Sequence, residues 1–428
     1  MAQQLYFSRD SKMFIEFDGV VWEVPVLDGF SFSQATNSTE ITLNEMESTG
    51  GVSRRGRRAF NDSLAPGEWS FSTYVRPFKS STTGTGKADS AAEVHAVEEV
   101  LWALFAGAKN YDATAFDYDT GGTNVITPGT SSSTINLGSS NSSTLGTANV
   151  YFVLGSDNRK VMKLKDVTVN EASVDFDIDG IATINWSGSA SEVLDFTGST
   201  HEDNTAPVHS DTTNDGGTIA IGDVWLDAND SYRLYVLTNV TNGSEARTAY
   251  RDEAVLATNN FIRNRLTVLS VTPTTRDPDS DSVNELETNY SLTLTGGNVT
   301  FTNNISYITP EELGIVNVPI GHVTGTRSVS GSFTCYLTED TSATNASADF
   351  FDDLRGITNV VTNSFALVFK IGGASGTPRL ELNMPTCHLE IPTHSVEDVI
   401  SLETNFMALP TTIAGTDEAT IIYHGAVV

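Results

Sequence analysis

Residues 48–69 have the sequence STGGVSRRGRRAFNDSLAPGEW and precede the alternating pattern SFSTYV at 70–75. A helical pattern, AAEVHAVEEVLWALFAGA, follows at 91–108. The order predicts a long polar loop, a two-faced strand and one amphipathic helix. Because this unit contains no catalytic arrangement of side chains, we interpret it as a device for assembly with other molecules.

The polar loop carries the chain's basic cluster, which consists of Arg54, Arg55, Arg57 and Arg58. The whole chain has 54 Asp and Glu residues against 24 Lys and Arg, a formal net charge of −30. A strongly acidic field repels nucleic acid. We therefore expect these arginines to pair with carboxylates of a neighbouring copy, a contact that the guanidinium geometry suits. A nucleic-acid contact and a solvated loop without a partner are the alternatives.

Composition favours an all-β chain of more than one domain. The length of 428 residues exceeds one ordinary core. A hydrophobic content of 39%, with abundant Ser, Thr, Asn and Gly, is typical of many short strands with wide polar faces. The first residues, MAQQLYFSRD, contain no apolar segment of a secretory signal, and no apolar run is long enough to span a bilayer. We expect synthesis in the cytosol and no contact with a membrane.

The first part of the chain predicts strands and then a helix. One hairpin is expected around Asp18-Gly19, and a second between 30–32 and 41–43. The helix is predicted from an N-cap at Asp89 or Ser90 to a stop at Gly107. The Gly/Ser/Thr/Asn-rich segment 118–149 predicts either a flexible excursion or weak edge strands.

The second half of the chain repeats this order. Residues 30–32 and 41–42 match 290–292 and 301–302 at an offset of 260, and FSTYV at 71–75 matches FTCYL at 333–337 at 262. A long loop and a helix candidate at 346–354 follow, and 167–169 match 387–389 at an offset of 220. This common order indicates an internal duplication. The turn-rich segment 198–217 is the best boundary between the halves.

Two acidic stretches resemble calcium loops. At 175–180, DFDIDG has the opening of such a loop, but Trp186 occupies the twelfth position, so a strand with an acidic face is the better interpretation. In a second stretch Ser and Thr replace the turn Gly and the final Glu, which favours an acidic loop over a metal site. Its weak candidate ligands are Asp277, Asp279 and Asp281.

Other chemical motifs are weaker still. Cys335 and Cys387 lie in strand patterns and are interpreted as buried reduced thiols rather than a disulfide. The histidines show no metal-ligand spacing, and no nucleophile elbow or phosphate-binding loop occurs. We therefore predict no enzyme and no cofactor. A carbohydrate-active enzyme, with sugar platforms at Trp69, Trp186 and Trp225, is a distant alternative.

The succession of VPVLDGFSFSQATNSTEITLNEM, a long loop, WSFSTYVRPF and a single helix resembles the major tail tube proteins of long-tailed (siphovirus-type) bacteriophages. The resemblance implies a mainly β fold with two tandem antiparallel β-sandwich or barrel tube domains, each with one flanking α-helix. Domain A would span 1–198 and domain B, a divergent repeat of A, 260–428. Residues 199–259 would form a linker or additional strands.

The same resemblance implies a structural virion protein of the tail, made in the host cytoplasm, that assembles into stacked rings. Three chains with two tube domains each would give a trimeric ring with pseudo-sixfold symmetry. DNA would pass through the lumen without specific binding, and an acidic lumen suits this because attraction would stall a sliding polyanion. Expected partners are further copies of the chain, the tape measure protein and the tail terminator or tip proteins.

One other class of function remains open on the residues alone. Abundant Thr, Asn and Ser together with acidic loops are also typical of a non-catalytic β-sandwich surface, decoration or adhesion protein.

Overall fold

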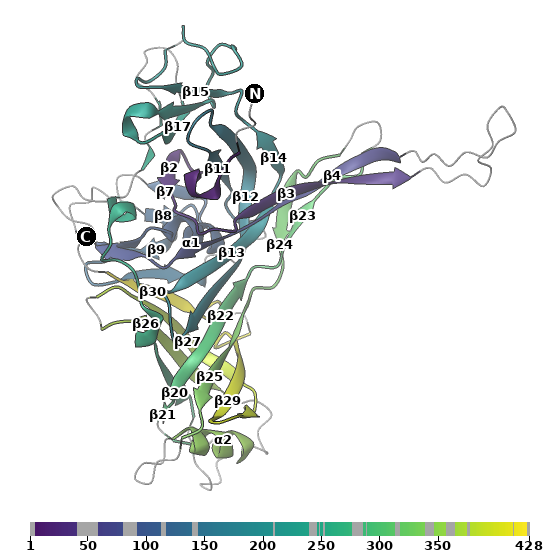
Figure 1. Ribbon diagram of the computed structural model, residues 1–428. Helices are drawn as coiled ribbons and strands as arrows, with labels where there is room; N and C mark the ends of the chain where they lie inside the picture. Colours follow the sequence, from purple (N-terminus) through teal and green to yellow (C-terminus); the bar gives the residue numbers. More distant parts are fainter. Residues whose placement is uncertain are drawn as a thin grey trace, which may run out of the picture.

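A computed structural model of the chain describes residues 5–40, 59–79, 92–112, 117–138, 144–208, 210–238, 246–247, 249–250, 253–275, 286–287, 289–312, 317–338, 346–356, 364–374, 377–413 and 415–425. The described residues form mostly β-strands, which pair into one large antiparallel sheet and three smaller ones. Figure 1 shows an elongated molecule, with β15 and β17 near one end and α2 near the other. The predicted mainly β fold class is confirmed.

The first half of the chain contributes a run of strands that pair in the order β2, β1, β11, β12, β13, β4 and β3. Every neighbouring pair in this run is antiparallel. The strands are β1 (Lys12–Phe17), β2 (Val20–Glu23), β3 (Ser31–Glu40), β4 (Ala59–Tyr74), β11 (Ala148–Leu154), β12 (Lys160–Asp177) and β13 (Thr183–Ala190).

The second half repeats this order with β21, β20, β26, β27, β29, β25 and β22, again antiparallel throughout. The short strand β28 continues β27 alongside β29. The strands are β20 (Val268–Pro273), β21 (Tyr290–Ser291), β22 (Leu294–Thr302), β25 (Ser328–Tyr336), β26 (Phe365–Gly372), β27 (Arg379–Leu389), β28 (Thr393–Val396) and β29 (Ile400–Ala408).

Two junctions join the halves into one sheet. Residues 171–177 of β12 pair with β22, after a bulge between Val169 and Glu171 has turned β12 from one layer to the other. The last strand, β30 (Thr420–His424), pairs with β27 and also with β10 (Ser133–Asn136) of the first half. The halves therefore share backbone hydrogen bonding as well as a core.

The remaining strands cover the layers and the ends. They are β5 (Pro77–Lys79), β6 (Val94–Ala96), β7 (Asn110–Asp112), β8 (Asp117–Asp119), β9 (Asn124–Thr127), β14 (Glu192–Asp195), β15 (Thr200–Asp203), β16 (Val224–Asp227), β17 (Arg233–Leu237), β18 (Ala246–Arg247), β19 (Ala249–Tyr250), β23 (Ile305–Ile308) and β24 (Gly321–Thr324). Short 3-10 turns lie at Ser8–Asp10, Ala228–Asp230, Glu253–Leu256 and Asn264–Leu266.

Two α-helices lie at corresponding places in the two halves, each after the strand that resembles FSTYV. Helix α1 (Glu99–Phe105) is buried along its whole length, and its Trp102 packs edge-on against Trp186 and Phe301 at 4.9 and 5.4 Å. Helix α2 (Ser347–Gly356) inserts Phe350 between Tyr290 and Phe365. Neither helix is long and apolar enough to cross a membrane, and the described residues contain no other candidate.

The region 199–259 forms more than a connection. Strands β15 to β18 make a separate small sheet. One of its faces packs against β1, β2, β11 and β12. The apolar residues of this contact are Phe14, Val21, Tyr151, Val153 and Val161 on one side and Val224, Leu226, Leu234 and Val236 on the other.

Several local predictions are wrong, and one alternative is decided. Helix α1 begins at Glu99, not near Ser90, because Val94–Ala96 pairs with β5 as a strand. The expected hairpin between 30–32 and 41–43 has no turn within 31–40, since β3 runs to Glu40 with β4 as its partner, and 41–43 lie outside the described residues. In the described part of 118–149, strands rather than a flexible excursion are present, but β8, β9 and β10 each pair on both sides and are therefore not the edge strands that the sequence suggested. The hairpin at Asp18-Gly19 is confirmed, and both residues have positive φ.

Candidate assembly surfaces

The joined strands β3, β4, β13, β12 (171–177), β22, β25, β29 and β28 present one face to solvent, and none of these segments contains Lys or Arg. Alternation explains the two faces: Trp69, Phe71 and Trp186 point into the core, while the residues between them point outward. The outward residues are mainly Ser, Thr, Asn, Asp and Glu. The outward-pointing set includes Ser31, Ser33, Glu68, Ser70, Ser72, Ser173, Asp175, Asn185, Ser187, Asn298, Thr300, Ser330, Ser332, Glu403 and Asn405. We call this the polar face.

Side-chain hydrogen bonds run across the polar face from strand to strand. The hydroxyls of Ser31 and Ser70 lie 2.9 Å apart. Ser72 donates to Asn185 Oδ1 at 2.6 Å, and Asn185 Nδ2 donates to Asp175 Oδ2 at 2.5 Å. Short polar side chains on neighbouring strands thus hold one another in place.

The charge on the polar face is negative. Its ionisable groups are carboxylates such as Glu68, Asp175 and Glu403. Burial raises the pKa of Asp175 from its ordinary value, although hydrogen bonds from Ser173 and Asn185 oppose the shift. With no Lys or Arg in these strands, they supply no cation that would hold a phosphate by charge.

Residues of the two halves can be matched through the partner registers of their strands. If Phe71 of β4 is placed on Phe333 of β25, then Ser70 falls on Ser332. The opposing residues follow: Ser31 falls on Asn298 and Ser187 on Asn405. The match of 30–32 with 290–292 inferred from the sequence is therefore wrong by seven positions. Continued through β13 and β29, the same matching places Asp175 on Ser395, because they lie opposite Thr183 and Ser401.

Two shallow hollows on the polar face support this matching. Each residue that lines the first hollow, of about 340 Å³, matches a residue lining the second, of about 470 Å³. The first is lined by Ser31, Ser33, Glu68, Trp69, Ser70, Asn170, Ser187, Gly188 and Ser189, and the second by Asn298, Thr300, Ser330, Gly331, Ser332, His388, Glu390, Asn405, Phe406 and Met407.

The two ends of this sheet are unprotected. Among the described strands, β3 pairs through its backbone only with β4, and β28 only with β29. Most side chains of β3 and all four of β28 are exposed, and neither strand carries a Lys, Arg or Pro. Edges without such groups favour pairing with another strand.

The distal part of the β3–β4 pair projects from the body as an arm (Figure 1). The second half provides a hairpin of β23 and β24 at the same place in its strand order, and the two touch where Leu64 N donates to Asn317 O at 2.8 Å. Phe60 on the arm is 63% exposed. The predicted contact residues Arg54, Arg55, Arg57 and Arg58 belong to the loop of this arm and lie outside the described residues.

A buried polar network connects the two halves. Tyr423 of β30 donates to Glu98 Oε1 at 2.8 Å, and the Arg76 backbone N donates to both Glu98 oxygens at 3.2 Å. The Arg76 guanidinium donates to Ala257 O at 2.9 Å and to Asn260 Oδ1 at 3.1 Å. Burial raises the pKa of Glu98 to about 7, against the opposing effects of Tyr423 and Arg76.

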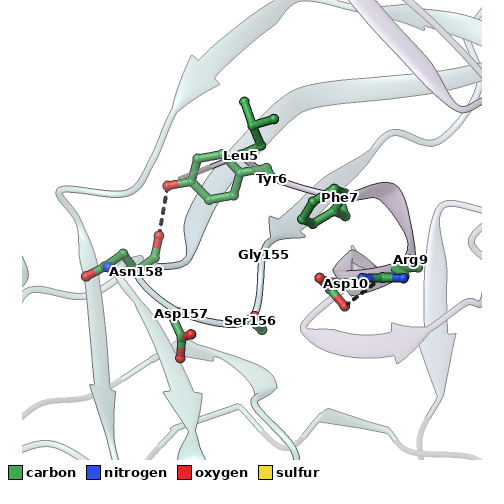
Figure 2. A pocket seen from close by; sticks show the side chains of 9 residues that line it. All are labelled: Leu5, Tyr6, Phe7, Arg9, Asp10, Gly155, Ser156, Asp157 and Asn158. Atoms are coloured by element: carbon green, nitrogen blue, oxygen red, sulfur yellow. Dashed lines mark hydrogen bonds and ion pairs between the residues drawn. The ribbon is translucent and has the colours of Figure 1, made fainter. Parts of the chain in front are cut away.

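A further hollow of about 350 Å³ lies at the N-terminal segment (Figure 2). Tyr6 crosses it and donates from its hydroxyl to Asn158 O at 2.9 Å, above Gly155. Arg9 and Asp10 form an ion pair of 3.9 Å at its other side. The lining consists of exposed side chains and has no nucleophile next to a base, so we assign it no chemistry.

Most of the other residues that the sequence suggested as functional are part of strands or of the buried core. Trp69, Trp186 and Trp225 are buried, which argues against the distant alternative of sugar platforms. The strand interpretation of 175–180 holds for 175–177, which belong to β12, whereas 178–180 lie beyond the end of that strand. Cys335 and Cys387 are buried free thiols. Asp277, Asp279 and Asp281 lie outside the described residues, and the residues that are described include no group of acidic, His or Cys side chains that could hold a metal.

Sequence reasoning did not single out the polar face. The signal was present as strands that alternate large apolar residues with Ser, Thr or Asn and lack every Lys and Arg. Only the pairing of distant strands shows that these stretches form one surface.

A comparison with known proteins agrees with this architecture. The chain is 28% identical over 400 residues to the tail tube protein pb6 of Escherichia phage T5. The aligned region covers 92% of this chain and 69% of that protein. No protein-family model matches the chain. The resemblance inferred from the sequence is confirmed: the chain is similar to a tail tube protein of a long-tailed phage, and this similarity supports a structural tail tube subunit of the virion.

Proposed function

We propose that three copies of this chain close a ring of six tube domains, and that such rings stack into the conduit for phage DNA. Each chain would contribute domain A (1–198) and domain B (260–428), with 199–259 forming the additional sheet beside domain A. The observation that carries this proposal is the repeated strand order, β2 to β3 in the first half and β21 to β22 in the second.

The polar face is the surface we assign to the lumen. DNA that slides through a tube requires a wall without fixed cations, because each phosphate held by Lys or Arg would slow it. The chain has 24 Lys and Arg residues, yet the strands that form this face contain none. Carboxylates such as Glu68 and Glu403 add repulsion, which keeps the duplex away from the wall.

The arm formed by β3 and β4 suits contact between stacked rings. It extends beyond the body and exposes an aromatic side chain, Phe60. Its loop carries the basic cluster in a chain of net charge −30, so carboxylates of the next ring are available as partners. The tape measure protein and the terminator or tip proteins are the further partners we propose for the tube's interior and ends.

The non-enzymatic character of the chain belongs to the same proposal. It is supported by the tail tube relative and by the structural roles of the candidate residues.

Electron microscopy of the purified protein tests the proposed assembly. Rings with threefold symmetry, or tubes with that repeat, are the expected result, and analytical ultracentrifugation should show association that rises with protein concentration. A stable monomer over a wide concentration range would contradict the proposal. A ring of six chains would contradict the two-domain stoichiometry while leaving the tube itself intact.

A further inference from the structure

We propose that β3 of one copy pairs antiparallel with β28 of the next copy, with Ser33 opposite Thr393 of that copy. This inference rests on the proposed function, and it specifies which edges close the ring and in which register.

The template is the junction inside the chain. There, residues 171–177 of domain A pair with β22 of domain B. In the matched strand order, β22 corresponds to β3, and residues 173–176 of β12 correspond to β28. The two strands at the ends of this sheet, each paired on one side only, are therefore the counterparts of the two strands that pair at the internal junction.

The register follows from the same matching. At the junction Ser173 lies opposite Thr300, and their hydroxyls are 3.0 Å apart. Ser173 corresponds to Thr393, and Thr300 corresponds to Ser33. The new pair again joins a Ser to a Thr hydroxyl, although the two residue types have changed sides. The adjacent outward pair, Asp175 and Asn298, becomes Ser395 and Ser31.

The side chains on the core side of β28 and of the β3 region are also complementary to each other. In this register Val396 of one copy lies opposite Phe30 of the next, and His394 lies opposite Phe32. Val396 is 74% exposed in the single chain, whereas Phe32 is half-buried and stacks on Phe152 at 5.0 Å. Pairing would extend this aromatic cluster over an apolar side chain that the single chain leaves in water.

Charge favours these edges as the point of approach. Two copies of net charge −30 repel each other. Residues 29–39 and 391–396 contain no Asp, Glu, Lys or Arg, so pairing there brings no carboxylates into direct opposition. Proteins that stay monomeric protect such edges with charges, whereas 31–39 of β3 and all of β28 carry no Asp, Glu, Lys or Arg.

The proposed interface between neighbouring copies is head to tail. Each copy uses β3 toward one neighbour and β28 toward the other, so the interface is heterologous and generates a ring if the rotation closes. A closed ring gives both of these edges a partner in every chain.

Disulfide trapping tests the register. Residues directly opposite on antiparallel strands have Cα separations of about 4.5–5.5 Å, within the range that a disulfide bridges. We expect the S33C/T393C double variant, oxidised after assembly, to give covalent dimers and trimers on a non-reducing gel. Native Cys335 and Cys387 should not compete, because burial raises the pKa of these thiols to about 11 and about 12.

Matched variants separate the outcomes. S173C/T300C should give an internal disulfide and no larger species, which calibrates the chemistry at the template junction. S33C/S395C shifts the pair by two residues, to a diagonal separation of about 7–8 Å, and should cross-link several-fold less. If S33C/S395C traps trimers better than S33C/T393C, the register is wrong. If tubes form but neither variant cross-links, the edge pairing is wrong while the proposed function stands. If no ring or tube forms, the proposed function fails first.

Discussion

Trp69 of β4 lies directly opposite Gly188 of β13, and the matching pair in the second half is reversed, with Gly331 of β25 opposite Phe406 of β29. In each half one aromatic ring covers one glycine. A Cβ on Gly188 would lie 2.6 Å from the Trp69 ring, and one on Gly331 would lie 2.9 Å from the Phe406 ring. The same volume is thus filled from opposite strands, which supports a divergent duplication of one packing arrangement.

This relationship predicts a loss of stability on adding one methyl group. We expect G188A to lower the free energy of unfolding by about 3 kcal/mol, because overpacking here meets the Thr168 backbone oxygen as well as Trp69. G321A is the matched control: that strand glycine has no atom within 4 Å of a built Cβ and should change little. Urea unfolding followed by tryptophan fluorescence measures both, and equal midpoints would contradict the packing argument.

The buried Glu98 predicts a pH dependence of stability. Its pKa is raised from 4.5 to about 7 in the folded chain, so the folded state binds the proton more tightly than the unfolded state. The contribution of Glu98 to the free energy of unfolding is fully present below pH 4.5. It is lost as pH rises through about 7, by about 3 kcal/mol in total.

The E98Q variant isolates this effect. Gln keeps the shape and cannot ionise, so the variant should gain stability relative to the parent chain between pH 5 and pH 8. Chemical denaturation of both proteins at the two pH values measures the difference. A constant difference across this range would show that Glu98 does not titrate there.

The proposed lumen predicts that added cations will hold DNA. Ser187 and Asn405 are matching residues on the polar face. We expect assembled S187K/N405K tubes to retain short DNA duplexes at low salt and to release them as salt rises, since phosphate contacts release counterions. Co-sedimentation at two salt concentrations is the measurement. The neutral S187Q/N405Q variant should behave as the parent does, and equal retention by all three would place the lumen elsewhere.

The basic loop predicts a defect in stacking rather than in folding. Replacing Arg54, Arg55, Arg57 and Arg58 by Glu should leave the melting temperature nearly unchanged and shorten the tubes or leave single rings. The loss of positive charge removes the attraction to carboxylates of the next ring. Tube length in electron micrographs reports the effect, and replacement by Gln should give an intermediate result. Tubes of normal length with Glu at all four positions would exclude this contact.

A large part of this protein follows from local sequence. Strict alternation around Trp69, Phe71 and Trp186 predicts two-faced strands, and it holds because side chains in a strand point to opposite faces with a period of two. The repeat of FSTYV as FTCYL indicates the duplication, since equivalent core positions need similar residues. The net charge of −30 follows from composition alone and argues against nucleic-acid binding before the structure is considered.

The helix boundary shows where local pattern fails. Val94, Val97 and Leu101 fit a helical stripe, yet Val94 lies in a strand because β5 supplies its hydrogen-bond partners. The partner comes from another part of the chain, and tertiary pairing overrides local preference. The unbroken β3 has the same explanation, since β4 pairs with it along its length.

By itself, then, the sequence determined the β class and the repeated order, because these depend on residue type and short-range periodicity, and it also showed the resemblance to phage tail tube proteins. The tertiary structure alone decided that distant Ser, Thr and Asn residues share one cation-free face, and that β3 and β28 are left open as counterparts of an internal junction. Such relationships depend on which strands pair, and pairing joins residues more than 100 positions apart, such as Ser173 and Thr300. No local pattern records that choice.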